Sequence, residues 1–203
     1  MTAPHNNDII KSREIFSTYI EGYGWWGNLN TLHAGEGYMY RSTATTNSTL
    51  VYHAGSRAPI DDETSDLHWT PVSASYVNNA SLMVTLDATA LPLSEEVEIG
   101  AFAYGECRGS AKLVYVEPVG RYMAFLTVYG NAGDELSFLV RQGGNTYPAN
   151  ERVEYADNLV LGNAKTPFTI SIHPVEQLMV YPNPVAVNAN FQRSEERRVG
   201  KEC

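Results

Sequence analysis

Two stretches, EVEIGAFAYG (residues 96–105) and RYMAFLTVYG (residues 121–130), decide the fold of this chain. Successive side chains of a β-strand point to opposite faces, so alternating apolar residues mark a strand with one buried face. The first stretch has this pattern, with Val97, Ile99, Ala101 and Ala103 on one face. The second stretch is apolar on both faces, which indicates a central strand covered on both sides. Such strands need a second sheet to bury them.

The alternation continues on either side of these stretches. SLMVTLDA (residues 81–88) and ELSFLVRQ (residues 135–142) each carry three alternating apolar residues. KLVYV (residues 112–116) follows a predicted turn at Gly109-Ser110, and residues 130–134 form another turn. About seven short strands separated by turn signals predict an antiparallel β-sandwich over residues 68–173.

Composition supports a globular domain and argues against two classes of partner. The 203 residues are 43% apolar and only 18% charged, which is too apolar for a disordered chain. The formal charge of −9 leaves no basic surface to neutralise phosphates, so we expect no nucleic-acid partner. No run of about eighteen apolar residues is present, so we expect no membrane span.

Residues 8–55 are predicted to form a small β module before the sandwich. The stretch 9–32 fits a short helix or a strand and turn, because three glycines interrupt any long helix. A turn at residues 35–37 leads into YMYRS (residues 38–42), which we expect to form a hairpin with LVYH (residues 50–53).

The remaining segments are predicted to lie outside these two modules. Residues 56–67, SRAPIDDETSDL, form an acidic linker, and residues 174–192 begin a new strand after a proline-marked joint. Residues 1–7 lack the basic and apolar regions of a signal peptide and are expected to be a disordered start inside a longer chain.

The last eleven residues, RSEERRVGKEC (193–203), resemble the translation of a sequencing-library adapter. They hold four basic and three acidic residues, and without them the chain has 10 basic and 20 acidic residues and a charge of −10. Cys107 is then the single cysteine, so no disulfide with Cys203 is expected.

Three strings resemble the C-terminal modules of Bacteroidota proteins exported by the type IX secretion system. WWGNL (residues 25–29) with GEGYMY (residues 35–40) is similar to a tryptophan-glycine segment and a GxGYM hairpin. IGAF (residues 99–102) with ECRG (residues 106–109) resembles a strand pair of an immunoglobulin-like module. The third string resembles the opening of a type A sorting domain, and the resemblance is carried by Tyr181, Pro182, Asn183 and Pro184.

This resemblance implies a secreted or outer-membrane-surface protein of a Gram-negative bacterium, which reaches the type IX machinery through the periplasm. The adapter-like tail interrupts the sorting domain eight residues after Pro184. The resemblance implies a non-catalytic accessory or adhesion scaffold, with any catalytic domain upstream of Met1. The alternative is a carbohydrate- or peptide-binding module that targets an upstream hydrolase.

Candidate binding residues are few. Flat aromatic faces suit sugar rings, so Trp25, Trp26, Tyr38 and Tyr40 are candidates for glycan stacking, although a small module also needs aromatics for its core.

Three carboxylates, Asp61, Asp62 and Asp66, offer oxygen ligands for calcium, but their spacing fits no EF-hand and a solvated linker is the stronger interpretation. We expect no other cofactor or metal.

Catalytic signals are weak. The sequence has no nucleophile elbow and no HExxH motif, and its five histidines are scattered. Cys107 could be a reactive thiol helped by Arg108, or a small apolar residue at a strand end, which is the preferred interpretation. We therefore expect no enzyme in this region.

Overall fold

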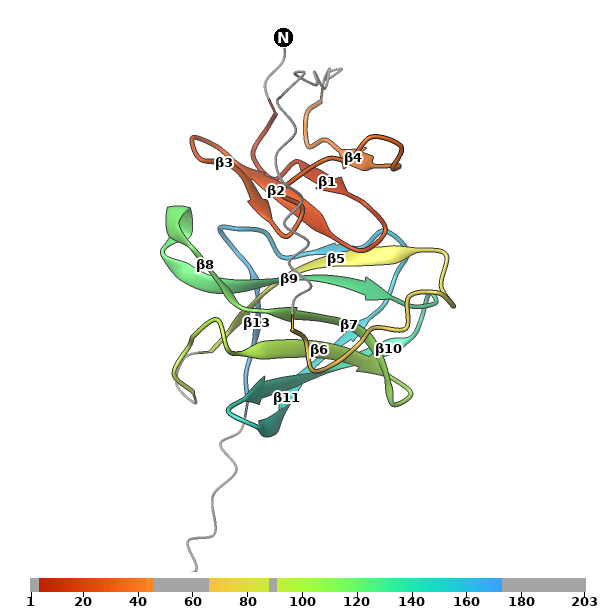
Figure 1. Ribbon diagram of the computed structural model, residues 1–203, viewed down its shortest axis with the longest axis vertical. Helices are drawn as coiled ribbons and strands as arrows, with labels where there is room; N and C mark the ends of the chain where they lie inside the picture. The colour runs from red at the N-terminus through yellow and green to blue at the C-terminus, as the bar shows by residue number, and fades with distance from the viewer. Residues whose placement is uncertain (1–3, 46–65, 88–90, 173–203) are drawn as a thin grey trace, which may run out of the picture.

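The computed structural model describes residues 4–45, 66–87 and 91–172, and these ranges are all-β. They form three sheets, which lie one above another in Figure 1. The one helical element within these ranges is the 3-10 turn η1 (Glu117–Val119). None of the helical structure in the described ranges is long or apolar enough to cross a bilayer.

The predicted β-sandwich accounts for two of the three sheets. The first has the order β11-β10-β6-β7 and consists of β6 (Glu98–Ala103), β7 (Glu106–Lys112), β10 (Glu135–Gln142) and β11 (Asn145–Glu154). The second has the order β12-β5-β9-β8, with β13 also beside β5; it consists of β5 (Asn79–Leu86), β8 (Val114–Val116), β9 (Arg121–Tyr129), β12 (Val160–Leu161) and β13 (Phe168–Ile170). Among the described strands, the chain crosses between these two sheets four times, after β5, β7, β9 and β11.

The core between these two sheets comes from the alternating residues that the sequence indicates. Ile99, Leu126 and Phe138 are each at most 1% exposed, and the first two come from the stretches that predict the fold. Each such side chain contributes about 1.5–3 kcal/mol by leaving water.

The third sheet is small and covers the outer face of the β5-β9 sheet. Its order is β3-β2-β1-β4, and it consists of β1 (Ile9–Lys11), β2 (Phe16–Ile20), β3 (Gly24–Gly27) and β4 (Met39–Arg41). Phe16 packs edge-on against Phe125 of β9, with ring centroids 5.8 Å apart, and Met83 and Met123 complete a second core. The two-faced apolar pattern of residues 121–130 is thereby confirmed, because β9 has a sheet on each side.

The predicted turn at Gly109-Ser110 is wrong. Both residues lie inside β7, and the chain turns at Tyr104 and Gly105, which have φ values of 52° and 79°. Gly109 serves close packing instead, since a Cβ there would lie 2.3 Å from the carbonyl oxygen of Thr127 in β9. A glycine within a strand often marks such a close backbone approach.

The strand directions correct the antiparallel prediction in one respect. β12 and β13 run parallel to β5, whereas the other described strand pairs are antiparallel. The chain returns across the sandwich after β11 and fills the edge of β5. The edge strand β11 was not predicted individually, since its exposed positions are polar and Pro148 interrupts it at a register shift opposite Leu139.

Several predicted segments lie outside the described residues. These are LVYH (residues 50–53), most of the linker over 56–67, the proline-rich motif at 181–184 and the adapter-like tail at 193–203. Within the described part, YMYRS supplies β4, which pairs with β1.

Candidate binding surfaces of the small sheet

An aromatic face lies on the side of the small sheet that faces away from the sandwich. Tyr19 and Trp25 are directly opposed on β2 and β3, with ring centroids 5.5 Å apart and an angle of 67° between the rings. Tyr40 of β4 packs against Trp25 at 6.3 Å and 66°. We call Tyr19, Trp25 and Tyr40 the aromatic trio.

The trio does not build a flat platform. Its edge-to-face geometry stabilises the rings against one another, but it leaves no common plane on which successive sugar rings could stack. Trp25 is the most exposed of the three, at 36%. The surface therefore offers one stacking position at most, on Trp25.

The other two predicted aromatics lie elsewhere. Trp26 points to the opposite face of the small sheet and packs against the second core, with Phe16 and Met123. It is a structural residue.

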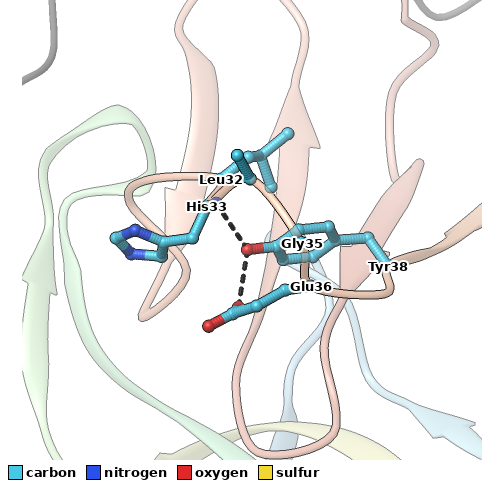
Figure 2. A pocket seen from close by; sticks show the side chains of 6 residues that line it. Leu32, His33, Gly35, Glu36 and Tyr38 are labelled. Atoms are coloured by element: carbon cyan, nitrogen blue, oxygen red, sulfur yellow. Dashed lines mark hydrogen bonds between the residues drawn. The ribbon is translucent and has the colours of Figure 1, made fainter.

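Tyr38 closes a loop. Figure 2 shows its hydroxyl between the backbone of His33 and the carboxylate of Glu36, accepting from the His33 N–H (2.7 Å) and donating to Glu36 Oε2 (2.8 Å). Residues of the loop 32–38 line a hollow of about 380 Å³. Because one exposed loop supplies all the walls of this hollow, it is a weak candidate for a binding site.

Asp8 is a buried carboxylate that the sequence did not single out. It is 0% exposed, and it accepts hydrogen bonds from the backbone N–H groups of His5 (2.9 Å) and Thr43 (2.6 Å). The hydroxyls of Tyr40, Ser42 and Thr43 also donate to it. These bonds tie the start of β1 to the end of β4.

The pKa values of Asp8 and its hydrogen-bond partner Tyr40 are shifted in opposite directions. Burial raises the pKa of Asp8, but the hydrogen bonds from Tyr40, His5 and Thr43 outweigh it and hold that pKa below its usual 3.8. Burial, followed by the hydrogen bond to Asp8 and its charge, raises the pKa of Tyr40 to about 12. Asp8 is therefore charged and Tyr40 neutral at physiological pH.

Two further carboxylates hold backbone segments in the same manner. Glu98, 3% exposed, accepts from the N–H groups of His68 (2.8 Å) and Trp69 (3.0 Å), which fastens the incoming chain to β6. Glu151 accepts from the N–H of Ser171 (2.8 Å) and from its hydroxyl (2.6 Å). We call Asp8, Glu98 and Glu151 the clamp carboxylates. A lone acidic residue in a strand pattern carries no signal for this role.

Cys107 does not have the surroundings of a nucleophile. Burial raises the pKa of its thiol to about 11, so the thiol is protonated at neutral pH. Arg108 lies 4.3 Å above the ring of Tyr76 and forms ion pairs with Glu106 (3.4 Å) and Asp134 (3.7 Å). The guanidinium therefore serves packing between segments, which favours the structural interpretation of ECRG.

The calcium candidates are only partly described. Asp66 is exposed, while Asp61 and Asp62 lie outside the described residues. Within the ranges that the structure describes, no three histidine, cysteine or acidic side chains gather as a metal site would require.

Comparisons of the chain with family models, with curated proteins and with solved structures give no significant match.

Proposed function

We propose that this region is a non-catalytic accessory scaffold of a secreted or cell-surface bacterial protein. The observation that carries the proposal is the fusion of three β layers through two buried cores. A body in which the small sheet shares Phe16, Met83 and Phe125 with the sandwich holds its ends at a defined separation. That property suits a spacer between an upstream domain and the cell surface.

The clamp carboxylates support the same proposal. Asp8 is buried and its pKa is lowered, and such acids often mark catalytic sites. Here Asp8, Glu98 and Glu151 are each bonded to backbone N–H groups at the ends of segments. Their hydrogen bonds serve the joining of layers and segments.

Export by the type IX machinery rests on the resemblance of residues 181–184 to a sorting-domain opening. The test replaces these four residues by alanine in the uninterrupted parent protein, expressed in a type IX secretion host. We expect the variant to remain in the cell, while alanines at residues 46–49 leave export unchanged. Equal export of both variants contradicts the sorting role.

Glycan binding is the second candidate, and the exposure of Trp25 favours it. A glycan that stacks on this ring changes the tryptophan fluorescence of the protein, and the change is lost in Trp25→Phe but kept in Trp69→Phe. No response of the wild-type protein across a broad polysaccharide panel removes this candidate.

A further inference from the structure

A groove of about 390 Å³ follows the junction between the small sheet and the sandwich. β1 and β4 form one wall, and β5, β12 and the residue Asn158 form the other. Ile9, Met39 and Val160 make its apolar lining, and Met39 is 56% exposed. The volume lies at the lower end of the range for small-ligand pockets.

The charged groups of this junction groove are both basic. The register of β1 and β4 pairs Ile9 with Arg41 and Lys11 with Met39, so Lys11 and Arg41 are diagonal neighbours on one face. The groove is lined by no carboxylate, although the chain as a whole carries a formal charge of −9. Burial, and next the charge of Arg41, lowers the pKa of Lys11. The two like charges thus lie together without a compensating anion in the lining.

The contacts of the two cations differ. Lys11 Nζ donates to three neutral oxygens: Asn79 Oδ1 at 2.7 Å, Asn158 Oδ1 at 3.1 Å and the backbone carbonyl of Asn79 at 3.4 Å. These bonds hold the ammonium group in place without neutralising it. The ion pairs found among the described residues involve Arg108 and leave Arg41 without a carboxylate partner there. Arg41 therefore has a guanidinium available to a ligand.

Ser81 provides an independent sign of a missing partner. Its side chain is 1% exposed and belongs to the lining of the groove, yet its Oγ makes no hydrogen bond. Buried hydroxyls are normally paired, because an unpaired one loses its hydrogen bonds to water without replacement. A ligand oxygen in the groove would satisfy it.

We propose that the junction groove binds a carboxylate that carries a short aliphatic chain. The planar fork of Arg41 pairs with both carboxylate oxygens, which a guanidinium does better than an ammonium group. Lys11 adds a second positive charge and Ser81 donates a hydrogen bond, while Met39 and Val160 cover the chain. A free short-chain acid and the C-terminal carboxylate of a peptide share this chemistry. The site is separate from the scaffold role and does not depend on it.

The test titrates the full chain, labelled with ¹³C at its methionine methyl groups, with hexanoate and with neutral hexanamide. We expect hexanoate to shift the Met39 methyl resonance in a saturable manner, and hexanamide to shift it far less. Ala-Ala-Leu and its C-terminal amide form a second arm, in which stronger binding of the free tripeptide than of hexanoate identifies a peptide terminus as the source. Equal shifts from hexanoate and hexanamide overturn the proposal.

Two variants locate the carboxylate. Arg41→Gln should weaken hexanoate binding about 10- to 100-fold, the range expected for a lost charge-assisted hydrogen-bond pair. Arg121→Gln makes the same charge change on β9 outside the groove and should bind as the wild type does. Ser81→Ala removes a hydroxyl that the free protein leaves unpaired, so it should weaken binding several-fold without lowering the thermal midpoint. Unchanged affinity in Arg41→Gln refutes the site.

Discussion

Asp8, Glu98 and Glu151 each accept hydrogen bonds from the backbone of a segment that has few ladder partners of its own. Burying an unpaired backbone N–H costs free energy. A carboxylate oxygen that accepts a charge-assisted hydrogen bond from this N–H removes that cost. Asp8 has the most such contacts, because two backbone N–H groups and three hydroxyls converge on it. At the residue scale, therefore, single acids hold together parts of the chain that are far apart in sequence.

Asp8→Asn should destabilise the protein by about 1–3 kcal/mol at pH 7, because the amide cannot accept all of these hydrogen bonds. The folded-state pKa of Asp8 lies below its unfolded value of about 3.8, so its stabilising effect is present above pH 3.8 and is lost as the pH falls through the folded pKa. Urea unfolding at pH 7 and at pH 3 should show a smaller difference between wild type and variant at pH 3. Glu21→Gln, on an exposed side chain, is the control. Equal urea midpoints at pH 7 contradict the clamp.

Cys107 should resist alkylation in the native protein. A thiol pKa of about 11, compared with an ordinary 9.0, reduces the thiolate fraction at neutral pH about a hundredfold. The measurement uses a Cys203→Ser background, so that one thiol remains, and follows iodoacetamide labelling by mass spectrometry with and without denaturant. Rapid native labelling is the outcome that restores the reactive interpretation.

At the scale of elements, β7 and β9 approach so closely at Gly109 that no side chain fits between them. A Cβ on Gly109 meets the backbone of Thr127 at 2.3 Å, whereas a Cβ on Gly37 has no atom within 4 Å and no unusual φ. Backbone atoms of a central strand cannot move as a flexible side chain does, so the two glycines tolerate substitution very differently.

Gly109→Ala should cost about 1–3 kcal/mol or more through overpacking, while Gly37→Ala should stay within about 0.5 kcal/mol of the wild type. Urea denaturation followed by far-UV circular dichroism measures both. A Gly109→Ala protein as stable as Gly37→Ala means that the two sheets do not meet at Thr127.

The whole molecule should unfold as one unit, because the small sheet has no separate core of its own. Its buried side chains Phe16 and Ile20 belong to the same cluster as Met123 and Phe125 of the sandwich. A four-stranded sheet of such short strands gains its stability from this packing. Layers that share a core lose it together.

Tryptophan positions allow this to be measured. Trp69→Phe leaves fluorescence from Trp25 and Trp26 of the small sheet, and the double variant Trp25→Phe/Trp26→Phe leaves Trp69 of the sandwich. In each variant we expect the fluorescence transition to coincide with that of far-UV circular dichroism. Adding Phe125→Ala to each variant should lower the free energy of unfolding by about 3–5 kcal/mol, and by the same amount whether Trp25 and Trp26 or Trp69 report it. Two separated transitions contradict the shared core.

The sequence by itself determined the all-β class, the sandwich and the central position of β9. Alternation is a local property, so residues 97–103 and 121–130 report which faces are buried without any knowledge of the partner. The candidate aromatics were identified by type, and two of them, Trp25 and Tyr40, do meet on one surface.

Only the tertiary structure decided what covers each face and which polar groups meet. The outer face of β9 is covered by residues 9–20, more than a hundred positions earlier, and the junction groove joins Arg41 to Ser81 and Asn158. The sequence predicts a turn at Gly109, because glycine is common in turns. The position requires glycine for another reason, since a carbonyl oxygen of β9 lies too close for a Cβ, and that oxygen is distant in sequence. Local patterns record whether a side chain is buried, but contacts between distant segments depend on how the layers stack, which no short stretch of sequence contains.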